Sequence, residues 1–120
     1  MTLCKKDASK PTASRGKRAP LDERPAGRRL LESDIQARVI ARAMQRNVYV
    51  RKVICIGRTG FPDLYLLRDG LAVLWEVKAV AGRLMPRQAL EHRLIKDAGG
   101  KVFVTFGLWD AYELLEELYP

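Results

Sequence analysis

The chain has 120 residues, with 22 Lys and Arg against 14 Asp and Glu, which leaves room for one domain of formal charge +8 at pH 7. Hydrophobic residues make up 48%, enough for a single core and too many for a disordered protein, and no apolar run approaches the roughly 18 residues that span a bilayer. Two cysteines, Cys4 and Cys55, and a lone His92 exclude a disulfide scaffold and a structural zinc site. Without an apolar leader at its start, the chain is expected to be a cytoplasmic, non-membrane protein with an anionic partner.

The basic charge is concentrated in residues 1–29, which hold nine basic and three acidic residues and three of the six prolines. Such a segment buries too little apolar surface to offset the entropy cost of ordering it. We predict a disordered basic arm over residues 1–29 and a folded domain over residues 30–120. The arm is either an inert solvated tail or an electrostatic tether for nucleic acid.

Helical periodicity begins directly after this arm. Apolar residues recur four positions apart at Leu31, Ile35, Val39 and Ala43. A neighbouring face carries three arginines four positions apart, Arg38, Arg42 and Arg46. We therefore predict a helix over residues 31–46, ending near Asn47, with a basic face suited to phosphate groups.

Further along the chain, three β-rich runs precede a helix, a strand and a final helix. The predicted strands are Val48–Ile56, Asp63–Arg68, Leu71–Ala79 and Lys101–Phe106, and the predicted helices run from Pro86 to Gly99-Gly100 and over Leu108–Leu118. In the helix that Pro86 starts, Leu90, Leu94 and Ile95 are expected to point inward. The order αβββαβα predicts an α/β domain built on a mixed sheet.

A tight turn at Asp69-Gly70 sets the register of the central hairpin. If these two residues form the loop, Arg68 faces Leu71, and opposed residue numbers sum to 139. Asp63 then faces Glu76 with Cβ atoms about 4.5–5.5 Å apart, a destabilising arrangement for two like charges. A divalent cation bound between the carboxylates reverses the sign of that interaction.

Two more charged residues belong to the same patch. Lys78 lies two residues after Glu76, and side chains two apart on a strand project from the same face. Glu32 falls on the inward stripe of the first helix, where a carboxylate is costly unless it is paired or binds a metal. The alternative for Glu32 is that it only complements the helix dipole.

These residues resemble a known signature. Gly60-Phe61-Pro62-Asp63-Leu64 followed by Trp75-Glu76-Val77-Lys78 is similar to the PD-(D/E)xK nuclease motif. The preceding Glu32 and the later Pro86-Arg87-Gln88 sharpen the resemblance to the virus-type replication-repair nuclease (VRR-NUC) family, from about Glu32 to Thr105. The resemblance implies a restriction-endonuclease-like core, here as a stand-alone nuclease domain of the kind seen in phages and bacteria.

The resemblance also implies a role for each matching residue. Asp63, Glu76 and the Val77 backbone carbonyl would ligate Mg²⁺ or Mn²⁺, and Lys78 would position or activate the attacking water. Glu32 would complete the acidic site, through a metal-bound water, and Gln88 would orient Lys78 or a phosphate.

Other residues receive weaker assignments. His92 is expected to be solvated among charged helix neighbours, and Cys55 to be a small core residue. Arg58 and Arg83 lie in glycine-bearing loops near the acids, where a phosphate clamp and a solvated loop are equally compatible with the sequence.

The preferred function is hydrolysis of DNA phosphodiester bonds, selective for structure, such as branched or four-way DNA, rather than for base sequence. By resemblance the enzyme would act as a homodimer, joined by its acidic last helix or its first helix, and would need no nucleotide cofactor. The alternatives are a non-catalytic nucleic-acid-binding module and an adaptor that docks another protein.

Overall fold

The computed structural model describes residues 30–120, so the predicted arm over residues 1–29 lies outside the described residues. The elements appear in the predicted order αβββαβα. They are α1 (Glu32–Gln45), β1 (Tyr49–Lys52), β2 (Leu64–Arg68), β3 (Leu71–Lys78), α2 (Pro86–Asp97), β4 (Val102–Phe106) and α3 (Leu108–Leu118). None of the helices between residues 30 and 120 combines the length and apolar character needed to cross a bilayer.

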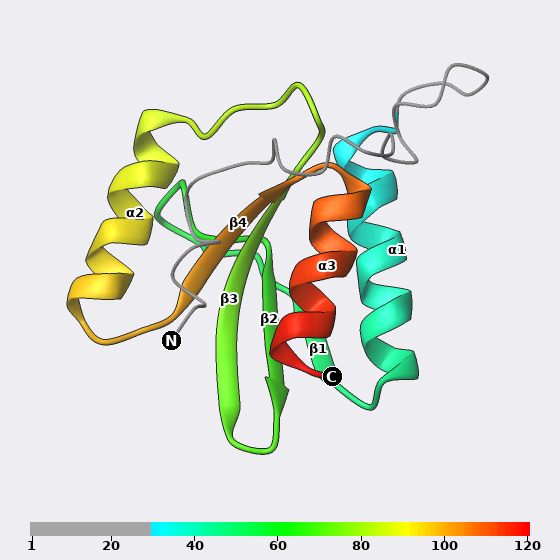
Figure 1. Cartoon of the computed structure of the whole chain (residues 1–120). Helices are drawn as coiled ribbons and strands as arrows, with labels where there is room; N and C mark the ends of the chain where they lie inside the picture. The colour runs from blue at the N-terminus through cyan, green and yellow to red at the C-terminus, as the bar shows by residue number, and fades with distance from the viewer. Residues whose placement is uncertain (1–29) are drawn as a thin grey trace.

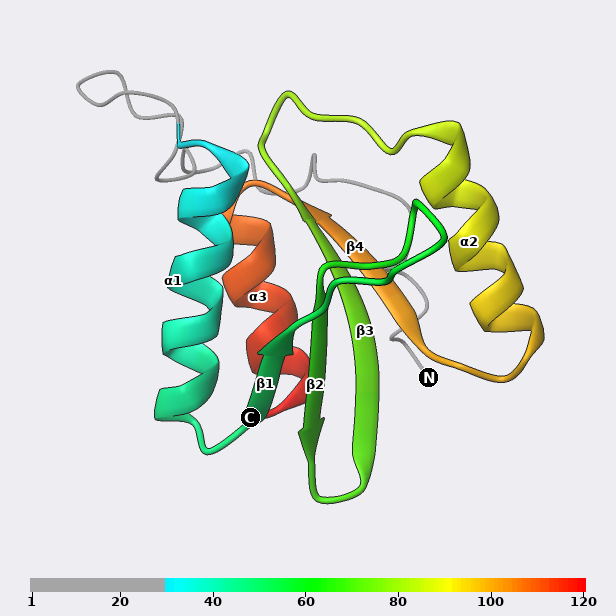
Figure 2. The same ribbon diagram turned by 180° about the vertical axis from the view of Figure 1, so that it is seen from behind.

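The four strands form one mixed sheet in the order β1-β2-β3-β4. The first three strands are antiparallel, whereas β3 and β4 run parallel because α2 carries the chain back between them. Helices α1 and α3 lie side by side against the sheet, and α2 stands apart from them on the β4 side (Figures 1 and 2). The α/β fold class predicted from the sequence is confirmed.

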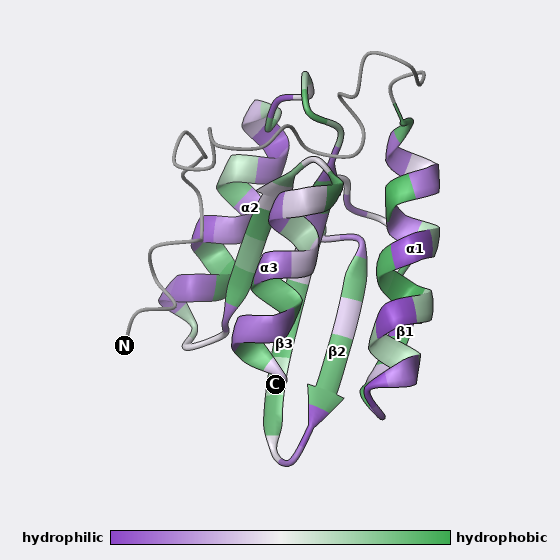
Figure 3. Ribbon diagram, turned by 45° about the vertical axis from the view of Figure 1, so that its right-hand side comes forward, coloured by the Kyte–Doolittle hydropathy of each residue, from purple (hydrophilic) through white to green (hydrophobic). Residues whose placement is uncertain are grey.

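The core lies between the sheet and the α1–α3 pair. The inward stripe of α1 is buried as predicted, except that Leu31 precedes the helix and is exposed. Trp75 is fully buried, and its indole N–H donates to the Thr105 hydroxyl at 2.8 Å, which satisfies its polar atom inside the core. Strands β2 and β3 are mainly hydrophobic along their length, while polar and apolar residues alternate around α1 (Figure 3).

The central hairpin adopts the predicted register. Asp69 and Gly70 both have positive φ, 52° and 83°, as a two-residue turn of the favoured mirror-image type requires. Arg68 pairs with Leu71 and Leu64 pairs with Trp75, so each opposed pair sums to 139. The next pair in this register is Asp63 and Glu76.

The first strand is shorter than predicted. It ends at Lys52 rather than Ile56, and the last ladder bond is from the Val53 N–H to the Asp63 carbonyl at 2.8 Å. Pro62, which would pair next, has no N–H to donate. The chain therefore leaves the sheet as a long loop, in which Cys55 is exposed rather than in the core. Its neighbours Ile54 and Ile56 are 84% and 92% exposed.

The inward direction predicted for two leucines of α2 is wrong. Leu90 and Leu94 are exposed, whereas Ile95 is partly buried. The face of α2 that approaches the sheet carries Gln88 and His92, so the leucines point away from it. In α3, by contrast, the leucines and Ala111 are buried against the core, while Trp109 and Tyr112 are partly exposed.

Candidate active site

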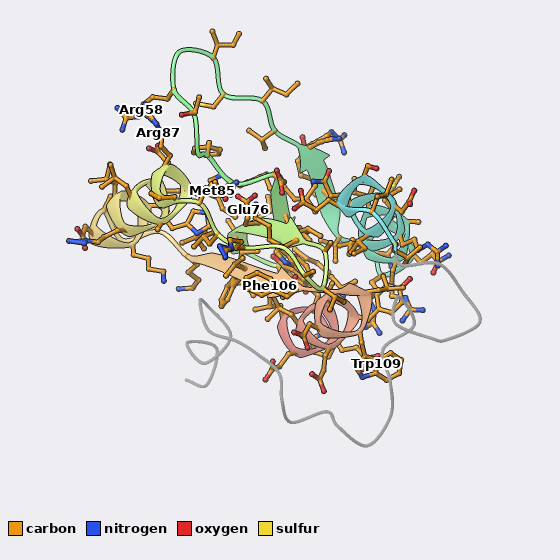
Figure 4. The ribbon with its side chains drawn as sticks, turned by 90° about the horizontal axis from the view of Figure 1, so that it is seen from above. Arg58, Glu76, Met85, Arg87, Phe106 and Trp109 are labelled. Carbon is orange, nitrogen blue, oxygen red and sulfur yellow. The ribbon has the colours of Figure 1, made fainter. Side chains whose placement is uncertain are left out.

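The predicted acidic patch lies at the end of the sheet where β2 begins and β3 ends. The first turn of α1 approaches it from one side and the first turn of α2 from the other. Figure 4 looks down on this end and shows Glu76 near the centre, with Met85, at the start of α2, close by. The fold thus brings together side chains that are more than fifty residues apart in the sequence.

Asp63 and Glu76 lie next to each other in this patch. Asp63 Oδ2 accepts a hydrogen bond from the Val77 N–H at 3.2 Å, and Glu76 is 1% exposed. Burial, and after it repulsion by the Glu76 charge, raises the pKa of Asp63 from 3.8 to about 6, against the opposing effects of the Val77 N–H and Lys78. The unfavourable carboxylate pair expected from the register is therefore present.

Lys78 places its ammonium between two acids. Its Nζ lies 3.7 Å from Glu32 Oε2 and 3.8 Å from Glu76 Oε2, and the side chain is almost entirely buried. The Glu32 side chain is 42% exposed, so this carboxylate sits at the rim of the patch, open to solvent. Glu32 therefore does more than complement the helix dipole, because it contacts Lys78.

Gln88 uses both ends of its amide. Its Oε1 accepts the Met85 N–H at 2.8 Å, which satisfies an unpaired donor at the start of α2. This contact directs the NH₂ group toward the patch, where Nε2 donates to Glu76 Oε2 at 3.1 Å. The prediction placed Gln88 at the site but gave it Lys78 or a phosphate as its partner; its contact is Glu76.

The prediction that His92 is solvated is wrong. His92 is 6% exposed, and its Nε2 lies 3.5 Å from Glu76 Oε1. Its charged neighbours in the sequence suggested a solvent-exposed face of the helix. However, helix residues four apart share a face, and Gln88 lies four residues before His92. The spacing from Gln88 to His92 was the signal that could have placed this residue at the site.

A close backbone approach connects the β1–β2 loop to α2. Gly60 has φ 97°, and a Cβ built there would lie 2.6 Å from the Arg87 carbonyl oxygen. Only glycine combines this conformation with this contact. The contact sets where α2 begins relative to Asp63, and hence where Gln88 meets Glu76.

The five arginines expected to contact nucleic acid differ in their surroundings. Arg42 stacks 3.7 Å from the centre of the Tyr112 ring, and Arg46 pairs with Glu116 at 2.7 Å. Arg58 pairs with Glu91 of α2 at 3.2 Å, while Arg38 and Arg83 are exposed. Arg58 and Arg87 project from the same side of the molecule in Figure 4, and Trp109 lies beyond the sheet from them.

The chemistry of these donors fits a hard cation. Within residues 30–120, no three His, Cys, Asp or Glu side chains form a ready-made metal cluster. The pair Asp63 and Glu76, however, offers carboxylate oxygens at one point, and burial and then repulsion by Glu76 raise the pKa of Asp63. A divalent cation favours oxygen ligands and would relieve that repulsion.

Comparison with known proteins identifies similar structures but no sequence match. No family model matches the chain, and no curated protein matches it significantly. A solved structure described as a VRR_NUC domain superposes with a TM-score of 0.67 at 31% identity, covering 73% of this chain and 97% of that chain. A second, described as a VRR_NUC domain protein, has a TM-score of 0.64 at 17% identity, covers 74% of this chain and 88% of that chain, and supports the fold alone.

Proposed function

The chain belongs to the VRR-NUC family, and from this premise we propose that it is a metal-dependent endonuclease that hydrolyses phosphodiester bonds in DNA. The observation that carries the proposal is the meeting of Asp63 and Glu76 beside a buried Lys78. A sequence selected for stability alone would avoid two adjacent acids at the end of a sheet. Two adjacent carboxylates that destabilise the fold are consistent with a catalytic site.

In this proposal Asp63, Glu76 and the Val77 carbonyl hold Mg²⁺ or Mn²⁺. The cation, when bound, acts as a Lewis acid toward a phosphodiester. Asp63 contributes a negative charge only when deprotonated, which its pKa of about 6 allows at neutral pH. Gln88 donates a hydrogen bond to one oxygen of the Glu76 carboxylate.

Lys78 supplies the second part of the chemistry. Its ammonium lies within 4 Å of both Glu32 and Glu76, where it orients an attacking water and stabilises the negative charge that develops on the phosphate. Glu32, at the solvent rim, accepts a hydrogen bond from that water. By family analogy the products carry a 5′-phosphate and a 3′-hydroxyl.

The proposed substrate is branched DNA, such as a flap or a four-way junction. Arg38, Arg58 and Arg83 are exposed and would contact phosphates, which position DNA without reading its bases. This favours selectivity for DNA shape over sequence, in the cytoplasm of a bacterium or a phage-infected cell. No nucleotide cofactor is needed for hydrolysis.

We also propose that the enzyme is a homodimer, so that two sites cut two strands. Four of the eight large apolar residues that are exposed between residues 30 and 120 lie on the β1–β2 loop and on α2, two segments that the Arg58–Glu91 ion pair connects. We call Ile54, Ile56, Leu90 and Leu94 the loop–α2 surface. Exposed apolar surface of this kind is typical of protein interfaces.

The test is a Mg²⁺-dependent digestion of single-stranded, duplex, flap and four-way DNA. The wild-type protein is expected to cut at least one substrate, and Asp63→Asn and Lys78→Ala are expected to lose cleavage by at least about 100-fold. Both variants should still bind DNA. Cleavage that persists in both variants would indicate a contaminant, and binding without cleavage by the wild type would favour the non-catalytic module.

A further inference from the structure

We propose that His92 is a positioning residue, which together with Gln88 holds both oxygens of the Glu76 carboxylate from one face of α2. Gln88 donates to Oε2, and His92 presents Nε2 to Oε1 from one helical turn further along. The inference rests on the proposed nuclease function, because it concerns a carboxylate that would bind the metal.

The two facing atoms lack partners in the described part of the chain. His92 Nε2 and Glu76 Oε1 are both buried and make no hydrogen bond there, although they lie only 3.5 Å apart. Leaving a buried polar atom without a hydrogen bond destabilises the folded protein. Two hydrogen bonds of about 2.8 Å that meet at a water at a tetrahedral angle join atoms about 4.6 Å apart, so a separation of 3.5 Å favours a direct contact over a bridging water. The pair is thus arranged for a direct hydrogen bond from Nε2 to Oε1.

One side of the His92 imidazole borders a cavity. Behind His92 lies a cavity of about 210 Å³, lined by Leu84, Ala89, Val102 and Val104 and bordered by Arg93 and Lys96. The ring is therefore not packed tightly where it lines this cavity.

A second contact changes what Glu76 can do. A carboxylate held at one oxygen by Gln88 still turns about its last side-chain bond, whereas one held at both oxygens has a fixed plane. Residues that orient a metal-binding carboxylate typically alter metal affinity by 10–100-fold when they are removed. His92 acts through Glu76 in this way, and it is not itself a ligand.

The experiment measures Mn²⁺ binding to the full chain by calorimetry, without substrate. His92→Leu is expected to weaken Mn²⁺ binding by about 10–100-fold. His92→Gln places an amide N–H at a similar reach and is expected to retain the affinity within about threefold. The matched control is Arg93→Leu, because Arg93 borders the same cavity but does not contact Glu76. This variant is expected to bind Mn²⁺ with unchanged affinity. Thermal unfolding without metal checks that each variant folds.

Three results would overturn the inference. The first is that His92→Leu binds Mn²⁺ with wild-type affinity, and the second is that His92→Gln and His92→Leu weaken Mn²⁺ binding equally. The third is a nitrogen hyperfine coupling in the electron paramagnetic resonance spectrum of bound Mn²⁺, which would make His92 a ligand. Asp63→Asn separates this inference from the proposed function. If Asp63→Asn abolishes binding and His92→Leu does not, only the role of His92 fails. If the wild type binds no Mn²⁺, the proposed metal site fails and the role of His92 with it.

Discussion

Asp63 is held in a state that costs the folded protein free energy at neutral pH. Its pKa rises from 3.8 to about 6 because it is buried and lies beside Glu76. The folded state therefore binds this proton more tightly than the unfolded chain does. The resulting stabilisation is complete below about pH 4 and is lost as the pH rises through 6.

We expect Asp63→Asn to stabilise the metal-free protein at pH 7.5 by about 1 kcal/mol, or a few degrees in Tm. The variant removes a buried charge and its repulsion by Glu76, and its amide oxygen still accepts the Val77 N–H. The difference should vanish near pH 4. Thermal unfolding in the presence of a chelator at both pH values measures it. Asp69→Asn, the same change at an exposed turn residue, should show no such pH dependence. An Asp63→Asn variant that is less stable than wild type at pH 7.5 would contradict the repulsion.

At the scale of elements, the site depends on how the β1–β2 loop meets α2. The contact of Gly60 with the Arg87 carbonyl sets the start of the helix, and Arg58 and Glu91 add an ion pair one turn further on. A surface pair of this kind contributes little, since such pairs are worth about 0–1 kcal/mol. The glycine contact is therefore the more important constraint.

We expect Gly60→Ala to destabilise the protein by about 2 kcal/mol or more, because the new Cβ meets the Arg87 carbonyl at a positive φ. Gly57→Ala is the matched control: its φ is 91°, but a Cβ there meets nothing within 4 Å. Gly57→Ala should lower the free energy of unfolding by only about 1 kcal/mol, the cost of placing alanine at a positive φ. Denaturant unfolding compares the two, and equal losses would show that the contact with α2 contributes nothing.

The central hairpin and its acids could be predicted from the sequence because a two-residue turn leaves one register. The β1–β2 loop could not, because β-branched residues continue from Val48 to Ile56, and the strand ends only where Pro62 interrupts the pairing of β2 with it. His92 was misjudged for a related reason. Its burial depends on which face of α2 meets the sheet, and the apolar residues Leu90 and Leu94 suggested the opposite face.

For the whole molecule, the exposed apolar residues argue for association through the loop–α2 surface. We expect Ile54→Ser/Ile56→Ser to convert the proposed dimer to a monomer and to reduce paired cutting of a four-way junction, because an interface needs its apolar centre. Sedimentation measures the assembly state. Leu31→Ser/Met44→Ser is the matched control on α1, where both residues are also exposed. Dissociation by the α1 variant alone would move the interface to the first helix.

The positive charge of the domain should appear as salt-dependent DNA binding. Alanine at Arg38, Arg58 or Arg83 is expected to weaken DNA binding to a similar extent on all base sequences. Each variant should also lower the slope of log affinity against log salt concentration by about one for each phosphate that it no longer neutralises. Binding to a labelled junction over a series of salt concentrations gives the slope. Arg46→Ala should leave the slope unchanged, because the Arg46 side chain is only 24% exposed and binds both Glu116 and the Tyr119 carbonyl. Arg58 also pairs with an acid, Glu91, but its side chain is 55% exposed. An unchanged slope in the first three variants would contradict their phosphate contacts.

The amide of Gln88 ties the beginning of a helix to an acid on the sheet. Its oxygen receives the Met85 N–H while its nitrogen holds Glu76. A cation that fixes the Glu76 carboxylate should therefore also restrain the first turn of α2 through Gln88, and its binding should reduce backbone motion there. We expect Mn²⁺ to slow deuterium uptake at the Met85 amide, which would report metal binding from a residue outside the acidic pair. In Gln88→Ala, Mn²⁺ should no longer slow uptake at this amide.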